Sequence, residues 1–313
     1  MNYKWVRPKK PTYNKGVLVI DSDDGNIGDY SAWLPLFKRV ASKYSDWANT
    51  NCVVGVSAIN TADIGDSGKM TVEHLQELVD NHWELVSHGR YHTGLGKMEV
   101  VSDVSANSTT ITIRGAGQIR VEAGYTYNIT EGTTTEVIKP ISPTTTSNTF
   151  SEVEMTLESP LQNTYTTNAT IELTDSSLNT LLQGCIDDLN NWGFDCYHHV
   201  FTYHAGSQHQ FSQRSVDAVS NLFVSGRGKS GATNEVGTVD LSNLRCQLNN
   251  ITDSEVDTIL DDVALNDKLF IYYGHGETTQ SVLDKLEHLI EGALSRGIRI
   301  MTRTGALKHY GLM

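Results

Sequence analysis

Three acidic residues stand within four positions directly after an apolar run. The run, Gly-Val-Leu-Val-Ile, occupies residues 16–20, and Asp21, Asp23 and Asp24 follow it. Carboxylates this close together repel one another, so such a cluster at the end of a strand is typical of a cation site or of acid–base chemistry. Taken alone, these residues also fit a solvated acidic turn.

Two histidines four positions apart, His88 and His92, follow a second strand-like run at residues 84–87. Histidines at i and i+4 can share one face of a helical turn and bind one metal ion. A carboxylate from the first cluster would complete a set of two histidines and one carboxylate that leaves positions open for water. A chance pair, or histidines of the core, is the alternative interpretation.

Two further polar groups follow strand-like runs. Tyr203 and His204 come after residues 197–202, and His275 comes after residues 269–274. The carboxyl ends of the strands of a (β/α) barrel meet on one face, where such enzymes place their active sites. Four polar groups at four strand ends therefore predict a site at the mouth of a barrel.

The elements that must position these groups alternate between strands and helices, which predicts a parallel sheet or barrel. Hydrophobic spacing predicts strands at residues 16–20, 52–57, 84–87, 197–202, 269–274 and 298–302. It predicts helices at residues 31–48, 71–82, 178–189, 216–222, 252–265 and 281–296. Thr71 is a predicted N-cap, and a capping box is expected at Thr252 to Glu255.

Residues 98–175 have a different character, with 18 threonines in 78 positions and no His, Cys or Trp. Period-two alternation at residues 110–114, 118–122, 153–157 and 170–173 predicts half-exposed antiparallel strands. We therefore expect one α/β domain, residues 1–97 and 176–313, interrupted by an all-β module at 98–175. A disordered Thr-rich stalk is the alternative. Four aromatic residues of the module fit either sugar stacking or a core: Tyr125, Tyr127, Phe150 and Tyr165.

Composition excludes several classes of protein. With 38% apolar and 19% charged residues the chain can fold around a sizeable core. A net charge of −13 argues against a nucleic-acid partner, and no run of 18 apolar residues could span a membrane. Residues 1–15 lack the apolar stretch of a signal peptide. The four cysteines form no C-x-x-C pair and are expected to be buried free thiols.

These motifs resemble those of the polysaccharide deacetylases with a NodB homology domain, carbohydrate esterase family four. Residues 21–25 are similar to the family's Thr-Phe-Asp-Asp-Gly in their last three positions, and residues 83–92 resemble the strand that leads into its His-(Ser/Thr)-x-x-His. Residues 201–206 align with Phe-Arg-x-Pro-Tyr-Gly, and residues 269–275 with an apolar strand that ends in His. The resemblance implies an α/β fold, a distorted (β/α) barrel of the NodB type, interrupted by a small all-β inserted domain.

The resemblance also implies roles for individual residues. The expected ligands of a divalent metal, most often zinc, are Asp24, His88 and His92. Asp23 would be the general base for a metal-bound water that attacks an acetyl carbonyl. His275 would protonate the leaving group, and the backbone N–H of Ala205 would help to hold the oxyanion. The residues expected to contact the sugar are Tyr91, Tyr203 and His204.

Three departures from the family pattern bear on the base. Thr202 stands where an arginine normally orients it, and His204 replaces a proline. No Asp-x-x-Asp-Trp motif is found, and Arg245 is a candidate to replace part of it. We therefore expect a less well supported base.

The resemblance implies a metal-dependent deacetylase that hydrolyses N- or O-acetyl groups of a polysaccharide. The Thr-rich module carries a net charge of −7 and resembles phage tail parts, so virion assembly or homo-oligomer formation through residues 98–175 is a hypothesis. It would place the protein outside the cell or on a virion. A non-catalytic carbohydrate-binding protein on the same fold is one alternative. A haloacid-dehalogenase-type phosphatase, with Asp21 as nucleophile and Asp23 as acid, is another.

Overall fold

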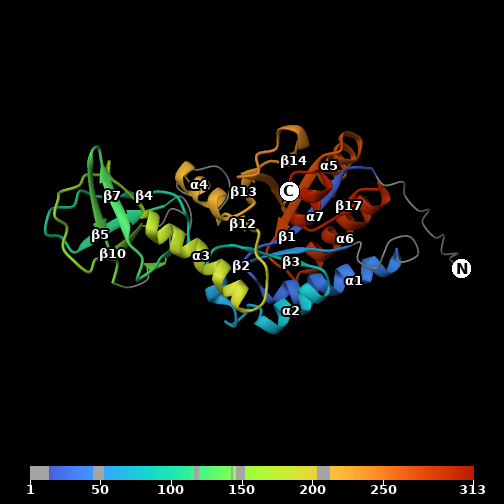
Figure 1. Ribbon diagram of the computed structural model, residues 1–313, viewed down its shortest axis with the longest axis horizontal. Coiled ribbons are helices and arrows are strands. Elements are labelled where there is room, and N and C mark those ends of the chain that lie inside the picture. Colours follow the sequence, from blue (N-terminus) through green and yellow to red (C-terminus); the bar gives the residue numbers. More distant parts are fainter. Residues whose placement is uncertain (1–13, 45–52, 116–119, 142–143, 146–151, 203–211) are drawn as a thin grey trace, which may run out of the picture.

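A computed structural model describes residues 14–44, 53–115, 120–141, 144–145, 152–202 and 212–313 of the chain (Figure 1). The molecule is elongated, with a β lobe at one end and a larger α/β body at the other. Within the described residues, no helix has the length and apolar character needed to cross a membrane.

The body is built on a closed barrel of seven parallel strands. β16 pairs with β15 on one side and with β1 on the other, and this second pairing closes the barrel. The strands around it are β1 (Val17–Ser22), β2 (Val56–Ile59), β3 (Glu84–Ser87), β12 (His198–Val200), β13 (Ser225–Ser230), β15 (Leu244–Leu248) and β16 (Leu269–Gly274). The expected distorted (β/α) barrel is therefore confirmed.

Alternation along β1 explains how the strands position polar groups. Val17 and Val19 pack in the core inside the barrel, whereas Leu18 and Ile20 pack outward against the helices. Because side chains alternate along a strand, Asp21 has the same orientation as Val17 and Val19 and enters the barrel interior. This places a carboxylate beside the apolar side chains of the barrel interior.

Helices surround the barrel, and several begin at caps that the sequence predicts. Thr71 accepts from the backbone N–H of His74 at the start of α2, and Thr252 and Glu255 form the expected capping box of α5. The helices are α1 (Leu34–Lys43), α2 (Val72–Asp80), α3 (Asp175–Asn191), α4 (Gln213–Leu222), α5 (Asp253–Asn266), α6 (Gln280–Ser295) and α7 (Arg303–His309).

Several elements differ from the sequence-based expectation. The helix expected at 31–48 begins as a π-helical turn, Asp29–Trp33, before α1. The strand expected at 52–57 is β2, which begins at Val56. The final strand is only β17 (Arg299–Ile300), which pairs with β1. In the body, the strands and the α-helix that the sequence analysis did not predict are β13, β14 (Thr233–Asn234), β15 and α7.

The β lobe is a six-stranded antiparallel sheet in the order β10-β5-β4-β11-β7-β8. Side chains of β5 alternate between half-buried and buried, as the period-two pattern predicts. The strands are β4 (Met98–Val100), β5 (Thr110–Arg114), β7 (Tyr127–Glu131), β8 (Thr134–Ile138), β10 (Glu152–Thr156) and β11 (Thr170–Leu173), with a separate pair of β6 (Arg120–Val121) and β9 (Thr144–Thr145). The described part is thus a folded sheet rather than a stalk, while the domain limits at 98 and 175 stay a prediction.

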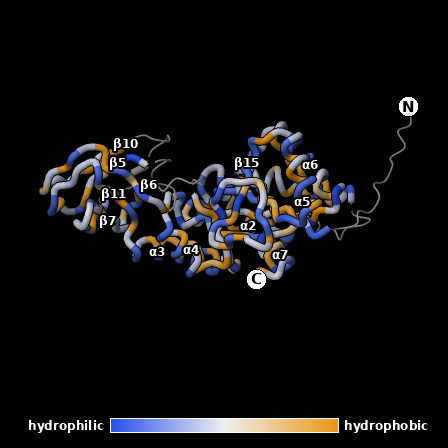
Figure 2. Tube along the Cα trace, turned by 90° about the horizontal axis from the view of Figure 1, so that it is seen from above, coloured by the Kyte–Doolittle hydropathy of each residue, from blue (hydrophilic) through white to orange (hydrophobic). Residues whose placement is uncertain are grey.

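The lobe joins the body through α3 and α4, which lie beside it in two perpendicular views (Figures 1 and 2). Thr126 of the lobe donates its backbone N–H to Ser177 Oγ at 2.8 Å. Arg214 of α4 pairs with Glu172 of β11 at 3.5 Å and with Asp175 at 2.5 Å. The lobe is therefore anchored by polar contacts at the start of both helices.

Candidate active site

The turn after β1 presents two carboxylates at the mouth of the barrel. The backbone N–H of Asp23 donates to the carbonyl of Gly274 at 2.9 Å, which ties this turn to the end of β16. Asp24 has a φ of +77° and Gly25 a φ of +62°. Aspartate is one of the few residues other than glycine that adopt this left-handed conformation readily. The resulting sharp turn separates the two side chains, so that they serve different partners.

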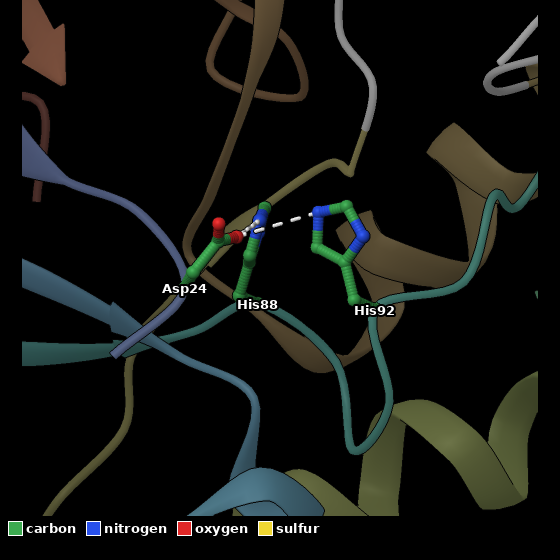
Figure 3. A group of neighbouring side chains, drawn as sticks. All are labelled: Asp24, His88 and His92. Atoms are coloured by element: carbon green, nitrogen blue, oxygen red, sulfur yellow. Dashed lines mark ion pairs between the residues drawn. The ribbon is translucent and has the colours of Figure 1, made fainter. Parts of the chain in front are cut away.

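Asp24, His88 and His92 converge at this mouth (Figure 3). Asp24 Oδ1 lies 3.3 Å from His88 Nε2 and 3.4 Å from His92 Nε2. The expectation of a helical turn between the histidines is wrong, because residues 88–92 form an irregular loop in which Gly89 has a φ of +87°. The loop nevertheless brings the two imidazoles together, with ring centroids 5.1 Å apart.

The hydrogen bonding of His88 indicates what this cluster binds. Its Nδ1 lies 2.9 Å from the carbonyl oxygen of Val200, which can only accept, so Nδ1 carries the proton. In this tautomer, Nε2 directs a lone pair toward Asp24 Oδ1. Within the described residues, that buried oxygen has no hydrogen-bond donor. Acceptor atoms that face one another in this way suit a divalent cation, and a carbonyl that orients a ligating histidine is common at metal sites.

The protonation states of the three groups also suit a cation. Burial, and then the neighbouring His88, lowers the pKa of His92 to about 4. Burial would raise the pKa of Asp24, but the neighbouring His88 and then His92 outweigh it, and the pKa is lowered. At neutral pH the set therefore offers a neutral imidazole and an ionised carboxylate as ligands.

The predicted base, Asp23, is only 2% exposed and contacts the guanidinium of Arg227 on β13. Arg227 also reaches Asp21 Oδ2 through Nε at 2.8 Å, and Arg303 of α7 contacts the same carboxylate. Burial raises the pKa of Asp23, but the charges of Arg227 and then His88 overcome this and lower it. Two carboxylates and two guanidiniums are thus buried together beneath the mouth.

The expectation that Asp23 is less well supported is wrong, because Arg227 contacts its carboxylate. Arg227 comes from β13, the strand after the one that precedes Thr202, where the family pattern has its arginine. Arg245 does not substitute, because its exposed side chain donates to the carbonyl of Ser230 at 3.4 Å. Thr202 has another contact: its hydroxyl donates to the carbonyl of Thr93, directly after His92, at 2.5 Å.

His275 lies at the end of β16, and the charges of Asp23 and Asp24 act on it. Its partner is Glu277, which stands two positions away and to which the sequence analysis assigns no role. Glu277 Oε1 lies 3.6 Å from His275 Nδ1, and the two side chains are 31% and 42% exposed. Hydrogen bonding to Glu277 is the main cause that raises the pKa of His275, partly offset by burial.

Of the remaining predicted site residues, the structure describes Tyr91 but not the three at positions 203–205. Tyr91, on the loop between the two histidines, is half-buried and contacts the Tyr125 ring edge-on with a centroid distance of 6.2 Å. Tyr203, His204 and Ala205 lie outside the described residues, so their roles stay predictions.

Other candidates belong to the core. Asp21 is completely buried and paired with two arginines, which leaves no access for a phosphate ester and argues against the phosphatase hypothesis. The described tyrosines of the lobe that were candidates for sugar stacking are buried, as expected of core residues: Tyr125, Tyr127 and Tyr165. Phe150 lies outside the described residues, and the three described cysteines are buried free thiols: Cys185, Cys196 and Cys246.

Comparison with known proteins gives a likeness of fold. No protein-family model matches the sequence, and no curated protein matches it significantly. The solved structures that match are polysaccharide deacetylases of the carbohydrate esterase family 4 type. A chitin deacetylase from Colletotrichum lindemuthianum matches with a TM-score of 0.46 and 11% identity, over 96% of this chain and 89% of its own.

Two bacterial structures match at a similar level. The family 4 carbohydrate esterase from Streptomyces lividans has a TM-score of 0.44 and 8% identity, over 91% of each chain. The Streptococcus pyogenes deacetylase PplD has a TM-score of 0.41 and 9% identity, over 72% of this chain, and the match spans only 62% of PplD. Likenesses this distant do not identify this chain's activity, for which the residues at the barrel mouth are the guide.

Proposed function

We propose that this protein is a metal-dependent deacetylase that hydrolyses N- or O-acetyl groups of a polysaccharide. The observation that carries the proposal is the convergence of Asp24, His88 and His92 beside a second carboxylate, Asp23, that is fixed by a buried arginine. A carbohydrate-binding protein without activity needs no oriented carboxylate beside a cation site. The motif order in the sequence is consistent with the same activity.

The residues present fit a divalent cation, with Asp24 and the two histidines as its ligands. A cation bound there would lower the pKa of water toward about 7 and polarise a carbonyl group. Zinc is our first choice, because two imidazoles and one carboxylate form a donor set that it favours.

The proton transfers fall to two other residues. Asp23 is ionised and accepts a proton from the water that attacks the acetyl carbon. Arg227 keeps that carboxylate charged and oriented, since its guanidinium contacts both Asp23 and Asp21. His275 donates a proton to the departing amine or alkoxide. We further propose that the backbone N–H of Ala205 donates to the oxyanion. Tyr91, Tyr203 and His204 would contact the sugar.

The substrate we propose is an acetylated glycan of a bacterial surface, met outside the cell or on a virion. The Thr-rich, acidic β lobe motivates the virion hypothesis and is the part through which assembly or oligomer formation would take place. Size-exclusion chromatography with light scattering on the whole chain, compared with a chain from which 98–175 is deleted, tests this role. A monomer in both cases would contradict it.

Acetate release from a panel of acetylated chitooligosaccharides and bacterial glycans tests the activity. An amine-reactive probe separates N-deacetylation, which exposes an amine, from O-deacetylation, which does not. The Asp23→Asn variant should lose release while keeping its metal, and Asp66→Asn, at an exposed aspartate of a nearby loop, should behave as the wild type. Glycan binding without acetate release from any substrate would instead favour the carbohydrate-binding alternative.

A further inference from the structure

Glu277 turns back toward His275 and contacts it twice. Its Oε2 accepts the backbone N–H of His275 at 2.8 Å, and its Oε1 lies 3.6 Å from the imidazole Nδ1. The turn between the two residues uses Gly276, whose φ is +64°. One carboxylate therefore restrains both the main chain and the ring of the proposed acid.

Glu277 is itself held by two other elements. Asn249, directly after β15, donates its side-chain amide to Glu277 Oε1 at 2.8 Å. Trp33, in the π-helical turn after β1, donates its indole N–H to the carbonyl of Glu277 at 3.0 Å. A Cβ at Gly274 would lie 2.7 Å from Glu277 Oε2, so a larger residue there would displace this carboxylate. The carboxylate is thus fixed before any substrate arrives.

Glu277 is also a permanent anion. Burial alone would raise its pKa, but hydrogen bonds from His275 and then Asn249 lower it to about 2. The other charged groups that act on His275 are Asp23 and Asp24, from the turn after β1. Asn26, from the same turn, donates its side-chain amide to the carbonyl of His275 at 2.9 Å. Asn26 Oδ1 accepts from Lys69 Nζ at 2.8 Å, so the Lys69 ammonium is linked to the main chain of His275 through Asn26.

We propose that Glu277 is the positioning residue of His275: it anchors the imidazole through Nδ1 and leaves Nε2 as the nitrogen that delivers a proton to the leaving group. The proposal rests on the proposed deacetylase function for its chemical meaning. The pairing itself can be tested without activity.

The decisive experiment titrates His275 directly. NMR of histidine-labelled protein, with the His275 signal assigned from a His275→Gln variant, gives its pKa in the wild type and in Glu277→Gln. We expect this pKa to fall by at least about one unit in the variant, because a neutral amide no longer stabilises the imidazolium. A general acid must be protonated, so the alkaline limb of acetate release should move to lower pH by a similar amount.

Kinetics separate positioning from simple stability. At a pH above the shifted limb, kcat should fall about tenfold per unit of pKa lost, with KM unchanged. The matched control is Glu287→Gln on α6. Arg39 and Lys43 pair with Glu287 and lower its pKa to about 2, as in Glu277, but it lies outside the site. This control should change neither the His275 titration nor the pH profile.

The outcomes are distinguishable. Active protein with an unchanged His275 titration in Glu277→Gln would overturn the inference and leave the deacetylase proposal intact. A shifted titration in a protein that releases no acetate would support the pairing and overturn the proposed function. Should Glu277→Gln not fold, Glu277→Asp, which keeps the charge but shortens the side chain that reaches Nδ1, should give a smaller shift in the same direction, and no shift would count against the proposal.

Discussion

The guanidinium of Arg227, on β13, contacts the carboxylate of Asp23, beyond the end of β1, across the interior of the barrel. The same guanidinium lies 4.6 Å from the ring centroid of Tyr273 and reaches Asp21 through Nε. Both Arg227 and Asp21 are completely buried, so the contact is shielded from solvent. If Asp23 is the base, as we propose, its carboxylate is already oriented by this contact.

Replacing Arg227 by methionine should therefore damage both folding and catalysis. Removing one partner of a buried ion pair leaves an uncompensated charge, which typically costs about 3–5 kcal/mol. We expect a loss of that size in urea unfolding, together with loss of acetate release. Arg39→Met, which removes a half-exposed pair with Glu287, should cost about 1 kcal/mol or less and keep activity. Full activity of Arg227→Met would show that Asp23 needs no arginine.

The metal ligands make a second prediction. His88→Ala and Asp24→Ala should lower the metal content of purified protein from about one ion per chain to a trace, because each removes one of three converging ligands. Elemental analysis and acetate release should fall together, and a chelator should abolish activity of the wild type until metal is returned. His82→Ala, at an exposed histidine outside the cluster, is the control. A His88→Ala protein that retains a full complement of metal would contradict the site.

The ends of β1, β3 and β16 could be predicted from the sequence because each strand is a short, mostly apolar run with polar residues directly after it. Residues at these ends supply Asp24, His88 and His275, and the parallel topology alone brings them to one face. The i, i+4 spacing of the histidines was a correct signal for proximity and a wrong one for local structure. The two imidazoles come together because of the conformation of the loop after β3, and the spacing of the histidines does not specify that conformation.

Arg227 could not be predicted, because the sequence of β13, Ser-Gly-Arg-Gly-Lys-Ser, has no apolar run. Its glycines are required by packing: a Cβ at Gly226 or Gly228 would lie 2.8 Å or 2.9 Å from the ring of Phe201. A count of charges would have shown that two buried aspartates need cations. It would not have shown which arginines supply them.

The lobe should influence the metal site through Tyr125. Its ring packs edge-on against Tyr91, which lies on the loop between the two histidines of the proposed metal site. Tyr125→Leu should loosen this loop and weaken metal affinity by about tenfold, the size typical for a residue that supports a ligand. Competition with a fluorescent chelator measures the affinity. Tyr165→Leu, in the core of the lobe, should reduce stability without this effect. Equal metal affinity in Tyr125→Leu and wild type would mean that the lobe does not support the site.

The last prediction concerns Asp29, which is completely buried beneath the turn after β1. Its carboxylate accepts from the hydroxyls of Ser22 and Ser57, both at 2.5 Å. Burial is the main cause that raises its pKa to about 7, helped by the charges of Asp23 and Asp24 and opposed by the two serine hydrogen bonds. In the folded protein Asp29 is therefore still protonated at pH values where an unfolded aspartate, with a pKa of about 3.9, has lost its proton.

The sign of the effect follows from this difference in bound protons. Between about pH 4 and 7 the folded state binds the extra proton, so the contribution of Asp29 to stability is greatest at low pH and is lost as pH rises through 7. At about 1.4 kcal/mol per unit of pKa, the loss is at most about 4 kcal/mol. Asp29→Asn does not titrate. The free energy of unfolding of the wild type minus that of the variant should therefore decline over this interval.

Urea unfolding at a series of pH values, with a chelator present so that metal binding does not contribute, measures this difference. Asp66→Asn, at an exposed aspartate, should give a difference close to zero throughout. A wild-type-minus-Asp29→Asn difference that stays constant from pH 4 to 8 would show that Asp29 is ionised in the folded protein over the whole range. The Ser22 and Ser57 hydrogen bonds would then suffice to hold a buried charge.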